Sequence, residues 1–236
     1  MTTALITGAN RGLGLQAAHD LASLGWHVWL GSRDPGRGAE AARGLASLPG
    51  RVTPLALDVT DDASVEAAVE VVDDAGDPLD VLVNNAGITG PAVPPEETGP
   101  SDFLACFGVN LLGPVRVTRA FLPLLRRAED PRVVMVSSGV GSITRTSDPT
   151  RLESQIHSLI YPSSKAALNM VTSQYARAIP DVRFTAVDPG YTATDLNGHR
   201  GHQTVEEGTA IIVRAATGQA GGPSGVFIDA DGPLPW

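Results

Sequence analysis

The chain has 236 residues, of which 42% are hydrophobic and 18% are charged, which suits one α/β domain with a substantial core. Its formal net charge of −9 argues against a nucleic-acid partner, because a phosphate backbone requires a basic surface. Every apolar run is of strand length, so we expect no membrane span. The first residues lead straight into a strand without the charged region of a signal peptide, which argues against secretion.

Cysteine and lysine are both rare. Cys106 is the only cysteine, which excludes an intrachain disulfide and favours a reducing cytoplasm. A buried helix cysteine is favoured over a reactive thiol. Among the 17 lysines and arginines, Lys165 is the only lysine. Position 165 has therefore kept lysine in a chain that uses arginine everywhere else, which indicates a specific need for an ammonium group there.

Apolar periodicity predicts strands that alternate with helices along the whole chain. The expected strands are 4–6, 27–30, 52–57, 79–83, 132–136, 182–187 and 226–228, and the expected helices are 13–24, 39–48, 65–72, 101–127, 161–180 and 205–217. This order predicts a single Rossmann-type domain, a doubly wound parallel sheet of about seven strands with helices on both faces. We assign the cofactor half to about 1–130 and the catalytic and substrate half to about 131–236.

A glycine-rich turn connects the first strand to the first helix and reads TGANRGLG over Thr7–Gly14. Glycines let such a turn tighten and approach a pyrophosphate, which then meets the N-terminus of the helix. A plain turn is the alternative, but the strand-turn-helix context favours a dinucleotide site. The expected cofactor contacts in this turn are Gly8, Asn10, Arg11, Gly12, Leu13 and Gly14.

The end of the second strand favours NADP(H) over NAD. An NAD site places an acidic residue there for the ribose 2′-hydroxyl, whereas this chain has Ser32 and Arg33. Arg33 and Arg11 could both meet a 2′-phosphate, with Ser32 as a further hydrogen-bond partner. The alternative is that both arginines are solvated surface charges. Asp34 complicates the assignment, because it follows Arg33 and could approach the ribose.

Five motifs occur in a fixed order along the whole chain. They are the glycine turn, Asn84-Asn85-Ala86-Gly87, Ser138, Tyr161-x-x-x-Lys165 and Pro189-Gly190. The ordered set resembles the short-chain dehydrogenase/reductase family. The local sequences GYTATDL, VEEG and GPSGVF resemble its carbonyl-reductase-like branch.

The Tyr161 and Lys165 pair has its own chemical logic. A free tyrosine has a pKa near 10, and a nearby ammonium lowers it, which favours proton exchange at neutral pH. Residues four apart in a helix share one face. The resemblance implies that Tyr161 is the general acid or base and that Lys165 lowers its pKa and binds the nicotinamide ribose.

The resemblance also implies roles for residues elsewhere in the chain. Ser138 would bind the substrate carbonyl oxygen, and Asn110 would bend its helix and anchor a water in a proton relay to Lys165. Taken singly, each of the four residues has a plain structural alternative. The further cofactor contacts it implies are Asp58 and Val59 for the adenine, Asn85, Ala86 and Gly87 for the adenosine ribose, and Pro189, Gly190 and Thr192 for the nicotinamide. Asp58 could instead cap the following helix, a task that Asp61 and Asp62 could share.

Two segments depart from the family pattern. The interval between Ser138 and Tyr161 is longer than usual and adds a polar insert within 144–160, which leaves a monomer and a homodimer both open. His157 in that insert is expected to be a solvated loop residue. Residues of about 191–204 are expected to form a mobile substrate lid. Its His199 and His202 have no carboxylate or cysteine to complete a metal set, so we expect no metal.

The sequence therefore predicts an NADP(H)-dependent oxidoreductase that transfers hydride between NADPH and a ketone or aldehyde, or catalyses the reverse alcohol oxidation. The alternatives are an imine or quinone reductase on the same site and a catalytically silent NADP(H)-binding sensor. The expected partner is a small carbonyl or alcohol molecule, with neither nucleic acid nor membrane involved. The sequence does not identify that molecule.

Overall fold

Eight strands form one sheet in the order β3-β2-β1-β4-β5-β6-β7-β8 in the computed structural model, which describes residues 1–236. Seven of them are parallel, and the two-residue β8 pairs antiparallel with β7. The strands are β1 (Thr3–Ile6), β2 (His27–Ser32), β3 (Arg51–Ala56), β4 (Val81–Asn84), β5 (Arg132–Val136), β6 (Arg183–Val187), β7 (Val226–Asp229) and β8 (Gly232–Pro233). The predicted doubly wound parallel sheet is confirmed, with β8 as an addition.

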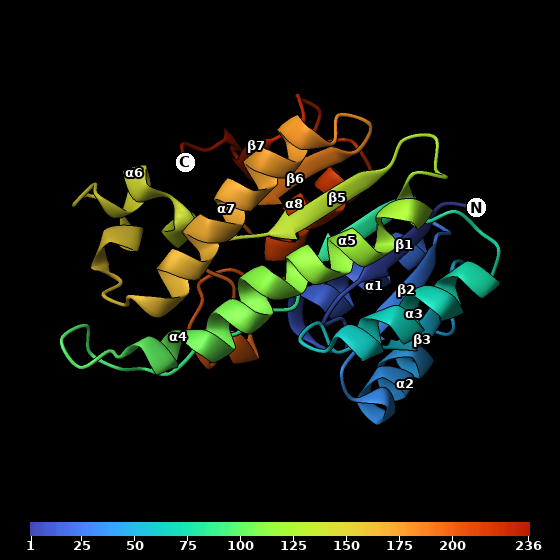
Figure 1. Cartoon of the computed structure of the whole chain (residues 1–236), viewed down its shortest axis with the longest axis horizontal. Helices are drawn as coiled ribbons and strands as arrows, with labels where there is room; N and C mark the ends of the chain where they lie inside the picture. Colours follow the sequence, from blue (N-terminus) through green and yellow to red (C-terminus); the bar gives the residue numbers. More distant parts are fainter.

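The main helices lie on both faces of this sheet (Figure 1). They are α1 (Gly12–Ser23), α2 (Pro35–Gly44), α3 (Asp62–Asp74), α4 (Pro100–Phe107), α5 (Gly113–Leu125), α7 (Ile160–Ala178) and α8 (Val205–Ala216). The chain runs from β1 outward to β3 and then returns to pair β4 with β1. This reversal creates a crevice at the carboxyl ends of the strands, where open α/β sheets bind their ligands.

Alternation along the strands divides the core into two layers. Ile6 faces the cluster that contains α1 and α8, through residues such as Leu21 and Ile212. Its neighbour Leu5 faces the cluster that contains Phe121 of α5. Because successive strand side chains point to opposite faces, a strand covered by helices on both sides must be apolar throughout. This explains why all four residues of β1 are buried.

Two helices differ from their predicted bounds. The second helix was expected at 39–48 but is α2, which begins at Pro35 and ends at Gly44. Asp34 caps it by accepting a hydrogen bond from the Arg37 amide at 3.1 Å, and proline at the first helical position is already in helical geometry. The expected helix 101–127 is interrupted by a π-helical turn, η1 (Gly108–Leu112), between α4 and α5.

The segment between β5 and α7, which includes the polar insert, contains three short helical segments. These are η2 (Gly139–Gly141), α6 (Ile143–Thr146) and η3 (Leu152–Gln155). In Figure 1 the insert extends beyond the end of the sheet, beside the start of α7. No helix is both long and apolar enough to cross a bilayer.

A glycine sets how closely α7 approaches the turn η2 that follows β5. A Cβ on Gly141 would lie 2.8 Å from the carbonyl carbon of Lys165, which is a backbone atom and cannot move aside. We therefore expect Gly141→Ala to lower the free energy of unfolding by about 1–3 kcal/mol, through the strain of overpacking, measured by urea denaturation. Gly44→Ala is the matched control, because nothing lies within 4 Å of a Cβ at that position. Equal stability of the two variants would contradict this account of the α7 contact.

Candidate active site

The four predicted catalytic residues meet at the carboxyl end of the sheet. Ser138 follows β5, Asn110 is the buried residue of the turn η1, and Tyr161 and Lys165 lie in the first two turns of α7. The helical spacing places Tyr161 and Lys165 on one face. The Lys165 ammonium nitrogen lies 5.6 Å from the centroid of the Tyr161 ring.

Lys165 is buried, with only 4% of its surface exposed. Its ammonium donates a hydrogen bond to the Val136 carbonyl oxygen at 2.8 Å. Burial disfavours the charged form, and it lowers the pKa of Lys165 to about 8. An amine with this pKa can exchange protons near neutral pH, which an ordinary surface lysine does poorly.

The pKa of Tyr161 differs in direction from the sequence expectation. Burial raises the pKa of the phenol, a hydrogen bond with Ser138 opposes this, and the charges of Asp188 and Cys106 add to the rise. The sequence predicted that Lys165 lowers this pKa. Here the ammonium is held on the Val136 carbonyl and burial dominates, so the net shift is upward.

Asn110 connects three parts of the site through its side-chain amide. Its Oδ1 accepts from the Ile88 amide at 2.9 Å, and its Nδ2 donates to the Ile88 carbonyl at 2.9 Å and to the Ser164 hydroxyl at 3.0 Å. The π-helical turn places this residue where the segment after β4 meets α7. Ser164 was missed in the sequence, although it directly precedes Lys165.

A second amide contact holds α7 against the end of β5. The Ser137 hydroxyl donates to Asn169 Oδ1 at 2.6 Å, and Asn169 Nδ2 donates to the Gly141 carbonyl at 3.2 Å. Asn169 was not singled out in the sequence. Its position four residues after Lys165, on the same helix face, is the signal that could have identified it.

The glycine turn has the geometry that a pyrophosphate site requires. Gly8 and Gly12 have φ values of +62° and +55°, a region that favours glycine. The N-terminus of α1 carries no side-chain cap, so its amide groups remain available to an anion. A Cβ on Gly14 would lie 2.4 Å from the side-chain nitrogen Nδ2 of Asn85, so this position has no room for a side chain.

Asn85 acts on the glycine turn itself. Its Nδ2 donates to the Thr7 carbonyl at 2.9 Å and to the Gly8 carbonyl at 3.2 Å. Its predicted place beside the adenosine ribose therefore comes with a structural task, which is to fix the shape of the turn. Ala86 is half-buried and packs against Gly8, whose Cβ would come within 3.0 Å of it.

The end of β2 presents one free arginine. Arg33 is exposed, while the carboxylate of Asp34 caps α2 and pairs with Arg37. Asp34 is thus occupied by the helix, which removes the complication it posed. Ser32 is buried, and its hydroxyl donates to the Asp34 carbonyl at 2.8 Å. It supports the turn that carries Arg33, and its predicted hydrogen bond to a 2′-phosphate stays a prediction.

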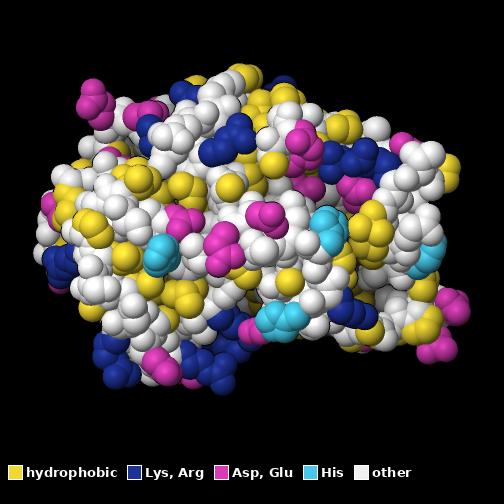
Figure 2. Space-filling model, turned by 180° about the vertical axis from the view of Figure 1, so that it is seen from behind, with side chains coloured by type: hydrophobic (Ala, Val, Ile, Leu, Met, Phe, Trp, Pro, Cys, Tyr) yellow, Lys and Arg dark blue, Asp and Glu magenta, His cyan; other side chains and the backbone are white.

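Basic side chains gather at this end of the molecule. Figure 2 shows them at the lower corner that carries α2 and β3. Arg33 and Arg37, at the end of β2 and the start of α2, are both exposed. An overall acidic chain therefore offers a local positive surface at the end of the sheet where the sequence predicted the adenosine.

The predicted lid contacts the glycine turn through Arg11 and Asp195. Thr192 and Gln203 form a parallel backbone bridge that closes the lid at its base. Arg11 lies 2.9 Å from Asp195, which also meets His199 at 2.9 Å. Arg11 is therefore directed to the lid in this structure, and not to the end of β2.

Asp58, a predicted adenine contact, is held by the residues that follow it. Asp58 accepts from the Thr60 amide and hydroxyl at 2.9 and 2.7 Å, while Asp61 caps α3. Asp61, and not Asp58, is therefore the residue that caps α3. Burial alone would raise the pKa of Asp58, but the Thr60 hydrogen bonds and the charges of Arg33 and Arg116 outweigh it, so the pKa is lowered.

Three other candidates are packed close to backbone or catalytic atoms. Val59 is buried and fits against Gly113, where a Cβ would come within 2.9 Å. A Cβ on Gly87 would lie 3.5 Å from Asn110 Oδ1 and 3.7 Å from the Lys165 ammonium. Thr192 is buried, and its hydroxyl donates to the Pro189 carbonyl at 3.3 Å.

No cluster of histidine, cysteine, aspartate or glutamate side chains has the geometry of a metal site. In the lid, His199 pairs with Asp195, while the ring of His202 lies 5.9 Å from that of Tyr191. The insert residue His157 is exposed. Cys106 is buried, with its thiol beside Asn110 and Ser164.

The family model described as short chain dehydrogenase matches residues 2–204. A relative from Penicillium roqueforti, named short-chain dehydrogenase anuI, is 37% identical over 94% of this chain and 90% of its own length. The (+)-neomenthol dehydrogenase of Arabidopsis thaliana is 34% identical, with 90% of each chain covered. Among solved structures, NADPH-bound carbonyl reductase from chicken fatty liver superposes with a TM-score of 0.85, at 28% identity, over 100% of this chain and 99% of its own.

The chain is thus a member of the short-chain dehydrogenase/reductase family, as the ordered motifs predicted. Its site is that of an oxidoreductase acting on carbonyl or alcohol groups with a nicotinamide cofactor.

The buried Lys165 makes stability depend on pH. Its folded pKa of about 8 lies below the ordinary value of 10.5, so between these values the unfolded chain binds more protons and stability rises with pH. Lys165→Met removes this term. The variant should gain up to about 3 kcal/mol over the parent near pH 7, with the gain shrinking toward pH 10. Urea denaturation at several pH values measures the gap, and a gap independent of pH would refute the buried charge.

Proposed function

We propose that this protein reduces a ketone or aldehyde with NADPH, or catalyses the reverse alcohol oxidation, with Tyr161 as the general acid or base. The observation that carries the proposal is the pairing of the half-buried Tyr161 with the buried Lys165, whose ammonium nitrogen lies 5.6 Å from the centroid of the Tyr161 ring. The NADPH-bound carbonyl reductase among the structural neighbours supports the cofactor.

The cofactor would lie along the carboxyl edge of the sheet. Gly8, Gly12 and the uncapped start of α1 fit a pyrophosphate. The exposed Arg33 fits a 2′-phosphate, and Arg11 is within the same turn. Pro189, Gly190 and Thr192 would flank the nicotinamide. When bound, NADPH supplies the hydride.

The chain supplies the proton and the binding of the carbonyl oxygen. The Ser138 hydroxyl would donate to this oxygen as negative charge develops on it. Tyr161 would donate its phenolic proton to the same oxygen, and its raised pKa keeps that proton in place until then. Lys165, with a pKa of about 8, would return a proton to Tyr161. Asn110, which is itself fixed by hydrogen bonds to Ile88 and Ser164, would anchor the water of this proton relay.

The same residues could serve other acceptors. An imine or quinone also needs one hydride and one proton, so the site alone does not distinguish them from a ketone. A silent sensor is disfavoured, because it has no use for a buried lysine whose charge is costly to maintain. An NADPH-consumption screen across ketones, aldehydes, quinones and imines separates these functions. The absence of turnover with all four classes would reject the proposal.

The proton relay requires both side chains. Tyr161→Phe and Lys165→Arg should each lower kcat by about 10²–10⁴, the range typical of a lost general acid or base. Arginine cannot be deprotonated usefully, so it keeps the charge but not the relay. Tyr175→Phe is the control, because this tyrosine of α7 stacks on Phe184 and should retain its activity. Near-normal turnover in folded Lys165→Arg would exclude the relay.

Cofactor preference tests the basic end of the crevice. The protein should bind NADPH more tightly than NADH, and Arg33→Asp should weaken NADPH by about tenfold or more, since it removes a charge-assisted hydrogen bond. Fluorescence titration of both cofactors measures this preference. Arg43→Asp is the control, because it makes the same charge change at the far end of α2. An NADH preference in the parent protein would overturn the assignment.

A further inference from the structure

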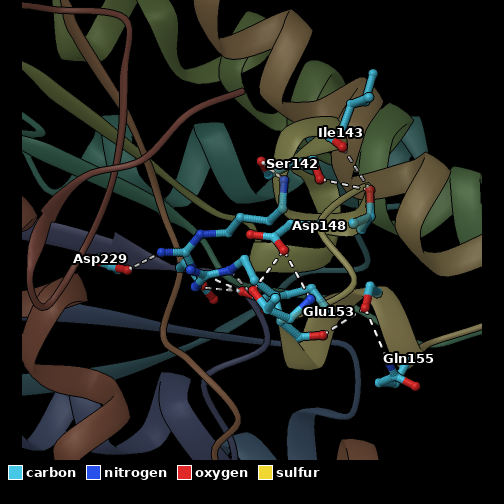
Figure 3. A network of polar contacts seen from close by, with 12 residues as sticks. Ser142, Ile143, Asp148, Glu153, Gln155 and Asp229 are labelled. Carbon is cyan, nitrogen blue, oxygen red and sulfur yellow. Dashed lines mark hydrogen bonds and ion pairs between the residues drawn. The ribbon is translucent and has the colours of Figure 1, made fainter.

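The insert contains a buried arginine that the proposed chemistry does not use. Arg145 lies in α6 and has a side chain only 14% exposed. Its guanidinium lies 2.9 Å from Glu153, 2.9 Å from Asp229 and 3.5 Å from Asp188. Figure 3 shows Glu153 and Asp229 reaching this network from different segments of the chain.

The three carboxylates come from separate parts of the site. Glu153 belongs to η3 of the insert, Asp188 directly follows β6, and Asp229 ends β7. All three side chains are at most 16% exposed. Like charges held this close and this far from water repel one another, so the cluster depends on a cation at its centre.

For two of the three carboxylates, Arg145 is the only ion-pair partner. Asp188 and Asp229 have no other ion-pair partner, whereas Glu153 also meets the half-exposed Arg151 at 3.4 Å. A guanidinium has five donors spread over three nitrogens of a planar fork, whereas an ammonium has three donors on one nitrogen, so arginine spans a wider set of carboxylates.

Asp188 carries the effect of this cluster into the site. One of its oxygens accepts from the Gly190 amide at 3.0 Å, and its other oxygen lies directly against Gly139. Gly139 directly follows Ser138, and Gly190 belongs to the turn proposed to flank the nicotinamide. A single carboxylate thus holds the substrate-binding turn and the cofactor-binding turn together.

Packing against Gly139 shows how tightly the cluster fits beneath Ser138. A Cβ there would lie 2.7 Å from Asp188 Oδ2, 2.9 Å from Glu153 Oε1 and 3.3 Å from Arg145 Nη1. The turn after β5 therefore rests directly on the ion cluster. Movement of the cluster would move Ser138.

Charge matters as well as position. Burial raises the pKa of Asp188, while the Gly190 and Gly139 amides and Arg145 oppose the rise. Without Arg145 this carboxyl would shift further toward its protonated form, and a neutral carboxyl is a weaker acceptor for the two amides.

We propose that Arg145 is a positioning residue of the active site, which locks the insert onto the ends of β6 and β7 and, through Asp188, holds the Ser138 and Pro189-Gly190 turns in register. The proposal rests on the proposed function, because it assigns these turns to the substrate and the nicotinamide. It makes the insert a supporting wall of the site. It also gives a role to the long interval between Ser138 and Tyr161.

The test compares Arg145→Gln with Arg151→Gln, in the full-length protein. Arg151 lies in the same insert and pairs only with Glu153, so its variant controls for loss of a charge in this segment. Two binding probes separate local from global effects. NADPH spans both ends of the crevice, whereas 2′,5′-ADP lacks the nicotinamide and reports only the adenosine end.

For Arg145→Gln we expect the Kd of NADPH to rise at least fivefold and kcat to fall about 10- to 100-fold, with the Kd of 2′,5′-ADP within twofold of the parent value. Arg151→Gln should match the parent in all three. If Arg145→Gln keeps parental NADPH affinity and kcat, or loses 2′,5′-ADP binding in proportion to NADPH, the positioning role is overturned.

Arg145→Lys guards against failure to fold. It retains the buried positive charge, but its donors all sit on one nitrogen and do not span the carboxylates as the guanidinium does, so we expect a kcat three- to tenfold below the parent and an intermediate NADPH Kd. Parental values in Arg145→Lys together with an unfolded Arg145→Gln would reduce Arg145 to a stabilising role and overturn the proposal.

Failure of the proposed function gives a different result. A parent that turns over none of the carbonyls would reject that function, while the comparison of NADPH with 2′,5′-ADP would still decide the role of Arg145. If the parent prefers NADH, then NADH and 5′-AMP form the matched pair of probes.

Discussion

The close contact between α7 and the end of β5 is the constraint on which the rest of the site depends. Gly141 leaves no space between its own backbone and that of Lys165, and Asn169 fastens the two elements by hydrogen bonds on either side. Only at this separation can the Lys165 ammonium reach the Val136 carbonyl. The helix therefore delivers a charged group into the interior, where water is scarce and its pKa can be altered.

Burying charge is costly, and the molecule does it twice within one region. Lys165 is neutralised partly by its lowered pKa, whereas the Arg145 cluster relies on opposite charges and backbone amides. Asp188 belongs to the second group, and its charge also raises the pKa of Tyr161. The two groups of buried charge are therefore coupled through one carboxylate, that of Asp188.

Much of this arrangement could be predicted from the sequence. Apolar runs and their spacing determine the sheet and its helices, because burial on both faces requires continuous apolar strands. The start of α2 was placed four residues too late, since Asp34 and Pro35 were not recognised as a helix start. The ordered motifs also predicted which side chains would meet at the carboxyl edge.

The remainder depends on contacts between distant segments, which no local pattern encodes. Arg145, Asp188 and Asp229 are far apart in the sequence, and each alone resembles an ordinary polar residue. The direction of the Tyr161 pKa shift could not be predicted either, because it depends on the depth of burial and on where the Lys165 ammonium points.

The Arg11 contact with Asp195 has a consequence for how the crevice opens. Both side chains are about half exposed or more, and exposed ion pairs of this kind contribute only about 0–1 kcal/mol. The predicted lid is thus tethered to the glycine turn by a weak contact that salt readily screens. A cofactor phosphate bound at that turn, as proposed, would compete with Asp195 for the Arg11 guanidinium. Binding of the phosphate and release of the lid would then be linked by an exchange of partners at one side chain.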